Sequence, residues 1–122
     1  MKEAASKIIT IEDADIVSFK ELLKFIYTGE YPKDLESSPE TYLPLAEKYD
    51  LQELKDCCSR AMIRNLVSGN AIDTLMMAYL FLCPALKTEC FRRLREWKTI
   101  MTDEDYEPLK KHPELLLELH RD

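Results

Sequence analysis

The chain has 122 residues, of which 46% are hydrophobic and 33% charged, so it can bury one core and is too apolar for a disordered segment. Its formal net charge of −6 argues against a nucleic-acid partner, because such affinity depends largely on Lys and Arg side chains that neutralise phosphates. It has only two glycines, and this scarcity favours helices over a β-rich fold with many tight turns. The longest apolar run, residues 75–86, is too short to span a bilayer, and no signal peptide is evident. We therefore expect a cytoplasmic or nuclear protein without a membrane partner.

The first predicted elements are a short strand and a helix. The run KIITI at residues 7–11 is β-branched, and we expect a strand near Ile8 to Ile11. A helix over roughly residues 16–27 follows, and Gly29 supplies the left-handed residue that ends it. Apolar side chains at i, i+3, i+4 and i+7 predict its core-facing side. They are Phe19, Leu22, Leu23 and Ile26. Phe25 lies off this stripe and needs a second neighbour.

Further helices are predicted along the rest of the chain, with short connections between them. Their approximate ranges are residues 37–49, 51–65, 72–79, 84–97 and 113–120, with a further cap-rich start at residues 102–105. Ser37 and Glu40 have the spacing of a capping box, and Pro44 is expected to kink the helix that contains it or to delay its start. Residues 67–70 are expected to form a turn with a serine cap. No internal repeat is evident.

Motifs for catalysis or metal binding are not found in the sequence. There is no glycine-rich phosphate loop, no Gly-x-Ser-x-Gly, and no Cys/His pair at metal spacing. The four cysteines, at positions 57, 58, 83 and 90, are expected to be buried free thiols in a reducing compartment. A nucleophilic Cys57 or Cys58 paired with His112 is the alternative that stays open. We expect no cofactor, no metal and no small-molecule substrate, so the function must lie in the surfaces of the molecule.

Three arginines form a short basic cluster. They are Arg92, Arg93 and Arg95, and acidic residues flank them. We interpret the cluster as a solvated helix face, with a binding patch as the alternative.

Several longer motifs carry a resemblance to one family. FKELLKFIYTGEY at residues 19–31 resembles the helix and turn of BTB/POZ domains, and residues 42–66, YLPLAEKYDLQELKDCCSRAMIRNL, are similar to the last two helices of that domain. Residues 65–90, NLVSGNAIDTLMMAYLFLCPALKTEC, resemble the helical extension called the three-box or the start of BACK. YEPLKKHPELLLEL at residues 106–119 is similar to the tail of the speckle-type POZ protein group.

The resemblance implies a mainly α fold, a compact array of about six helices with one short N-terminal strand. Residues 1–66 would be the C-terminal half of a BTB/POZ domain, and residues 67–122 the three-box or BACK-like extension. The N-terminal half of the BTB fold and a MATH domain would be absent. The expectation is therefore a truncated adaptor.

The resemblance also implies a partner, because BTB proteins of this kind dimerise and carry substrates to cullin-3 ubiquitin ligases. Met1 and Glu3 stand at the distance from the predicted strand at which cullin-binding members have a hydrophobic-x-Glu motif. The cullin-facing side is thus expected to survive in a non-catalytic interaction module.

Two predicted turns are the remaining candidate contacts. Tyr49 and Asp50 lie in the first, and Val67 and Asn70 in the second. Turns expose aromatic and polar groups to a partner, and aromatic residues carry much of the binding energy at interfaces. The alternative for Tyr49 is that it closes the local core.

A different class of function stays open beside the cullin-3 hypothesis. The chain could be a structural, oligomerising or transcription-scaffold fragment with no ligase role. Apolar residues that a missing N-terminal half would cover are expected to associate with a second copy or with another BTB protein.

Overall fold

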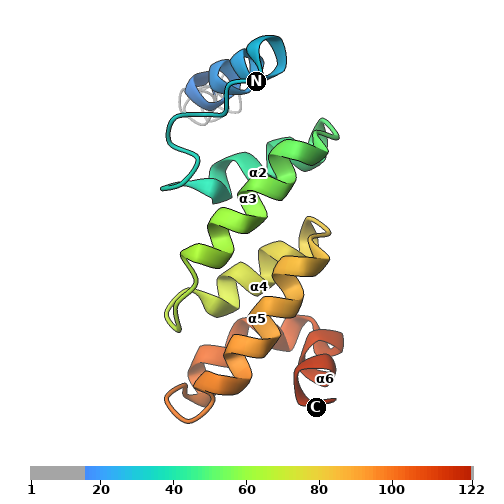
Figure 1. Ribbon diagram of the computed structural model, residues 1–122. Helices are drawn as coiled ribbons and strands as arrows, with labels where there is room; N and C mark the ends of the chain where they lie inside the picture. The colour runs from blue at the N-terminus through green and yellow to red at the C-terminus, as the bar shows by residue number, and fades with distance from the viewer. Residues whose placement is uncertain (1–15, 122) are drawn as a thin grey trace, which may run out of the picture.

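The computed structural model describes residues 16–121 of the chain, and all the elements in this range are helices (Figure 1). The first described helix covers residues 16–28. The elements after it are α2 (Pro39–Lys48), α3 (Gln52–Arg64), α4 (Ala71–Leu80), α5 (Pro84–Trp97), the 3₁₀ helix η1 (Asp103–Lys111) and α6 (Pro113–Arg121). The mainly α fold is therefore confirmed. The strand expected near Ile8 to Ile11 lies outside the described residues.

The helices form an elongated stack of antiparallel hairpins (Figure 1). α2 packs on α3, α4 packs on α5, and α3 joins the two hairpins by packing against α5. η1 then contacts α4, and α6 lies against η1 and α5 at the end of the stack farthest from the first helix. A capping box fixes the start of η1, where the Thr102 backbone N–H donates to Asp105 Oδ2 at 2.8 Å. The cap-rich start predicted at residues 102–105 is therefore confirmed.

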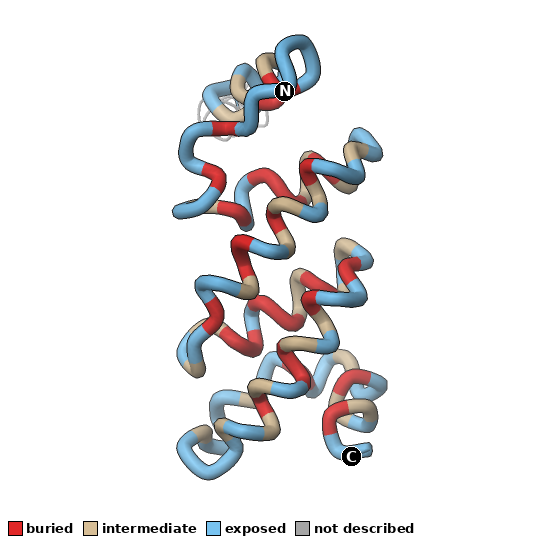
Figure 2. The backbone as a smooth tube through the Cα atoms, viewed as in Figure 1, coloured by how far each residue is buried: buried red, intermediate tan, exposed pale blue. Residues whose placement is uncertain are grey.

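One hydrophobic core runs through the whole stack (Figure 2). It begins with Leu22 of the first helix and ends with Leu119 of α6. Leu54 of α3 and Leu86 of α5 are fully buried, and the two hairpins meet where α3 packs against α5. Residues on both sides of the expected boundary at residue 66 therefore share one apolar interior.

The two hairpins repeat each other. Each has a helix of 10 residues, a three-residue turn, and a second helix of 13 residues in α3 and 14 in α5. The middle residue of each turn is left-handed, with φ of 54° at Asp50 and 57° at Leu82, 32 positions later. The next residue, Leu51 or Cys83, donates its N–H to the carbonyl of Ala46 or Ala78 at 2.8 and 2.9 Å. The sequence prediction of no internal repeat is therefore wrong at the level of structure.

Core residues match at the same offset of 32 positions. Buried counterparts in the two hairpins are Leu43 and Leu75, Ala46 and Ala78, Leu54 and Leu86, Cys58 and Cys90, and Met62 and Leu94. Repeat architectures bury equivalent faces of successive units against their neighbours, and the stack follows this rule over two units.

The first helix buries a different stripe from the predicted one. Leu22 is 1% exposed, whereas Phe19 is 38%, Leu23 36% and Ile26 49% exposed, so the prediction is right for Leu22 and wrong for the other three. Phe25 is buried instead, because the chain after the helix folds back and brings the Tyr31 ring within 4.9 Å of it. Gly29 closes the helix with φ of 80°, as predicted.

Several helix starts differ from the prediction in detail. Ser38 is the N-cap residue of α2 and makes no side-chain capping bond, so the capping box expected from Ser37 is wrong. α2 continues unbroken past Pro44 to Lys48. Asn70, rather than a serine, occupies the N-cap position of α4.

Candidate partner-binding surface

A groove of about 520 Å³ lies between the first helix and α2. Aromatic and aliphatic side chains form most of its wall, and Lys48 stands at its edge. The apolar members are Ile16, Phe19, Pro44, Leu45 and Tyr49. We call this feature the Phe19–Tyr49 groove.

Tyr49 belongs to the surface of the molecule. Its side chain is 43% exposed at the C-cap of α2, so the alternative that it closes the local core does not hold. The Phe19 ring is its aromatic neighbour, at 6.0 Å between centroids, and Lys48 Nζ lies 5.5 Å from the Tyr49 centroid. An exposed aromatic residue that packs on a neighbouring ring offers apolar area at little cost in side-chain entropy.

Asp50 extends this surface at the same turn. Its backbone is left-handed, with φ of 54°, a conformation that aspartate tolerates better than most residues. The turn is closed by the hydrogen bond from Leu51 N to Ala46 O, and the Asp50 side chain is exposed. Tyr49 and Asp50 therefore lie side by side in an exposed turn.

Val67 and Asn70 lie at the opposite end of α3. The 13 residues of α3 separate the two turns by about 20 Å at 1.5 Å per residue. Asn70 holds its own turn together: its Oδ1 accepts from Val67 N at 2.9 Å and its Nδ2 donates to Asn65 O at 3.0 Å. Val67 is exposed. The four residues thus form two separate patches, and the side-chain amide of Asn70 is already used.

Two candidates stay undescribed, and two groove residues were missed. Met1 and Glu3 lie outside the described residues. Phe19 and Lys48 are groove residues that the sequence analysis did not select. The sequence analysis assigned Phe19 to the core-facing stripe. The buried residues of this helix are instead Leu22 and Phe25, an i, i+3 pair that predicts a different core-facing stripe.

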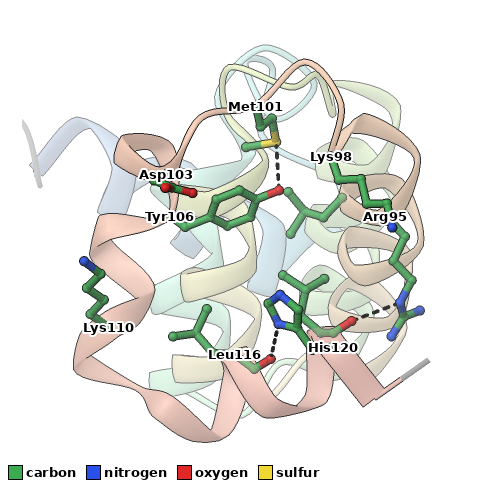
Figure 3. Close-up of a pocket in the computed structure, with 10 residues that line it drawn as sticks. Arg95, Lys98, Met101, Asp103, Tyr106, Lys110, Leu116 and His120 are labelled. Atoms are coloured by element: carbon green, nitrogen blue, oxygen red, sulfur yellow. Dashed lines mark hydrogen bonds between the residues drawn. The ribbon is translucent and has the colours of Figure 1, made fainter.

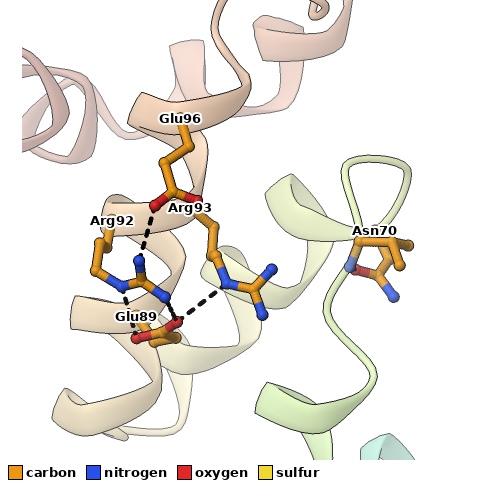
Figure 4. A network of polar contacts seen from close by, with 6 residues as sticks. Asn70, Glu89, Arg92, Arg93 and Glu96 are labelled. Carbon is orange, nitrogen blue, oxygen red and sulfur yellow. Dashed lines mark hydrogen bonds and ion pairs between the residues drawn. The ribbon is translucent and has the colours of Figure 1, made fainter.

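The basic cluster on α5 is largely neutralised by its own helix (Figure 4). Arg92 donates to Glu89 at 3.2 Å and to Glu96 at 2.8 Å, and Arg93 donates to Glu89 at 3.1 Å. The hydrogen bond from Arg92 is the main cause of the lowered pKa of Glu89. Arg95 has a different task, because it donates to two carbonyls near the end of α6. The solvated-face interpretation fits Arg92 and is incomplete for Arg95.

Three of the four cysteines are buried free thiols. Burial raises the pKa of Cys58 and Cys90 to about 12 and also raises the pKa of Cys83, so these thiols stay protonated and inert. Cys57 is the partly exposed cysteine, and its sulfur accepts from Arg60 at 3.2 Å. The expectation of four buried thiols therefore holds for three.

The described residues include few groups that could bind a metal ion or act through a histidine side chain. Residues 16–121 contain no group of three His, Cys, Asp or Glu residues placed to hold a metal ion. The His112 ring packs on Tyr79 of α4, with centroids 5.2 Å apart. Between residues 16 and 121, no helix is both long and apolar enough to cross a membrane.

A helical stack with an exposed aromatic groove defines a class of protein, the protein–protein interaction module. The profile of the BTB/POZ domain matches residues 1–66, just over half of the chain. The chain belongs to the BTB/POZ family. BTB domains mediate protein–protein interactions and dimerisation.

Curated relatives support the same family. TD and POZ domain-containing proteins 1 and 3 of Mus musculus are each 36% identical, over 97% of this chain and 33% of their own length. TD and POZ domain-containing protein 5 of the same species is 37% identical over 83% of this chain and 33% of its own length. The chain spans about a third of the length of these relatives. They support the BTB/POZ assignment and do not support the narrower speckle-type POZ assignment.

Proposed function

We propose that this BTB/POZ chain is a partner-binding module that binds cullin-3 and so takes part in assembling a ubiquitin ligase complex. The observation that carries the proposal is the Phe19–Tyr49 groove, because it presents an exposed aromatic ring beside an apolar wall. The family resemblance at residues 19–31 and 42–66 supports cullin-3 as the occupant. This partner agrees with a cytoplasmic or nuclear location.

The groove suggests how a partner helix would bind. An apolar side chain of the partner would enter between Phe19 and Leu45 and contact the open side of Tyr49. Lys48 and Asp50 offer opposite charges at the edge, which would fix the direction of the helix.

The second patch and the N-terminal motif complete the proposal. Val67 lies about 20 Å from Tyr49 along α3, so a partner helix needs about 13 residues to contact both turns. Met1, Glu3, Val67 and Asn70 are the proposed further contacts of the partner.

Calorimetric titration with the N-terminal region of cullin-3 tests this function. Tyr49→Ala should weaken binding roughly tenfold, the scale of an aromatic residue at an interface centre. Tyr27→Ala is the matched control, since it removes the same side chain from a site that is 82% exposed and does not line the groove. Glu3→Lys and Val67→Ala should each weaken binding without lowering the melting temperature.

Two results would contradict the cullin-3 function. The first is no heat of binding at concentrations where a full-length BTB adaptor binds. The second is an equal effect of Tyr49→Ala and Tyr27→Ala, which would remove the groove as the site.

A second function is favoured by the outward side of the first helix. Leu23, Ile26 and Tyr27 are all exposed there and fall within about 100° of the helix circumference, apolar area typical of an interface. This face would pair with a second copy or with another BTB protein, in a structural module without a ligase role. Light scattering should then show an oligomer that becomes a monomer in the variant Leu23→Glu, Ile26→Glu. A wild-type monomer at high concentration that binds no apolar dye would refute this pairing.

A further inference from the structure

A second hollow, of about 630 Å³, lies between α5, η1 and α6 (Figure 3). Its floor is apolar and includes Leu94 and Leu116. Tyr106 and Met101 form one wall, where the tyrosine hydroxyl donates to the methionine sulfur at 3.8 Å. The volume lies in the range of sites that take a ligand or an anchoring group of a partner. We call this feature the C-terminal hollow.

The hairpin repeat shows what kind of object would fit the C-terminal hollow. On α5 and its C-cap the hollow is lined by Leu94, Arg95 and Lys98. The counterparts of these residues 32 positions earlier are Met62, Ile63 and Leu66. Met62 and Leu66 are buried and Ile63 packs against the core. Beyond the second hairpin, η1 and α6 pack on α4 and α5 in place of a further hairpin, and the hollow is the space that they leave open beside α5.

The chemistry of the rim differs from that of the earlier repeat. Two apolar counterparts are replaced by Arg95 and Lys98, and Lys110 and His120 stand on the same rim. Asp103 is the one carboxylate among the lining residues. Lys110 makes an exposed ion pair with Glu107 at 3.1 Å, and within residues 16–121 no carboxylate pairs with Lys98. A chain with net charge −6 therefore has a locally cationic site here.

We propose that the C-terminal hollow binds an acidic amphipathic helix of a partner protein. The apolar stripe of that helix would contact Met101, Tyr106 and Leu116, the half-buried apolar residues of the lining. Its Asp and Glu residues would flank the stripe and face Lys98 and Lys110. A second copy of the chain fits less well, because two cationic rims would face each other across a twofold axis.

Fluorescence anisotropy with the intact 122-residue chain tests the proposal. The probe is a labelled, helix-stapled 14-residue peptide with Leu at i, i+3, i+4 and i+7 and Glu at the flanking positions. The matched control peptide has the same leucines with Lys at every Glu position. The Glu peptide should bind more tightly than the Lys peptide, and its affinity should fall as salt is raised.

Charge-reversal variants locate the binding. Lys98→Glu and Lys110→Glu together should weaken the Glu peptide by roughly tenfold and strengthen the Lys peptide. Lys20→Glu, on the first helix, is the control and should change neither. Circular dichroism and melting temperature verify that each variant folds. The readout is independent of cullin-3, so the two proposals can fail separately.

Three outcomes would overturn the proposal. One is that neither peptide binds up to millimolar concentration. Another is equal binding of the Glu and Lys peptides, which would make the contact non-specific. The last is a wild-type dimer that Lys98→Glu converts to a monomer, which would assign the hollow to contact between copies.

Discussion

Leu54→Ala and Leu86→Ala test whether the two hairpins are energetically equivalent. Both side chains are fully buried at matching positions of α3 and α5. Truncation removes three carbon groups, which amounts to about 2.4 kcal/mol of transfer free energy at ~0.8 kcal/mol for each. The unfilled cavity raises the cost to roughly 3–5 kcal/mol in either variant.

The melting temperature converts this cost into a measurement. Unfolding entropy of about 2.1 cal/mol/K per residue gives ~0.26 kcal/mol/K for a chain of 122 residues. A loss of about 3 kcal/mol therefore lowers the melting temperature by roughly 12 °C in both variants. Leu117→Ala is the control, because that side chain is 68% exposed, and it should cost less than about 0.5 kcal/mol.

Differential scanning calorimetry is the assay, with one transition expected because the core is continuous. A large loss for Leu54→Ala together with a Leu86→Ala value close to the Leu117→Ala control would refute the equivalence. Two separate transitions in the wild type would refute the single core.

Three other predictions concern single side chains. Leu22→Asp should unfold the chain, because it buries an unpaired charge. Leu23→Asp should fold with a small loss of stability. If thermal melting shows the reverse order, the stripe predicted from the sequence is the correct one. A thiol reagent should modify Cys57 first and the other three cysteines only after denaturant is added, and four fast thiols under native conditions would contradict their burial. Glu89 has a lowered pKa beside Arg92, so its contribution is present at neutral pH and is lost as the pH falls through its folded pKa. Urea titrations should therefore show the stability gap between wild type and Glu89→Gln closing below roughly pH 4, and a gap unchanged down to pH 2 would contradict the ion pair.

Helix positions could be predicted from the sequence, because local signals mark them. Prolines open α2, α5 and α6, and Gly29 closes the first helix at the expected residue. These signals act through backbone geometry within a few residues, so one sequence is enough to detect them.

Burial on the first helix could not be predicted, because two stripes overlap there. Leu22 belongs to both, and the choice between Leu23 and Phe25 depends on Tyr31, which returns over the helix after the turn. A periodic pattern over about 13 residues does not contain that long-range contact.

The candidate surface was accessible from sequence only in part. Tyr49 and Asp50 could be selected because a turn was predicted there, but the separation of Val67 from them depends on the length and direction of α3. The repeat was missed because the two hairpins share burial and turn geometry far more than residue identity.

The matching turns at Asp50 and Leu82 have a consequence for how such a chain can change in length. Each hairpin starts and ends on the same side of the stack and presents equivalent core positions to its neighbours. A whole hairpin could therefore be inserted or deleted in frame while the packing of the units on either side is kept. An indel of one or two residues inside a helix would instead rotate its buried face by about 100° per residue. Evolutionary or engineered changes in the length of this fold are therefore expected to occur in whole units of 32 residues.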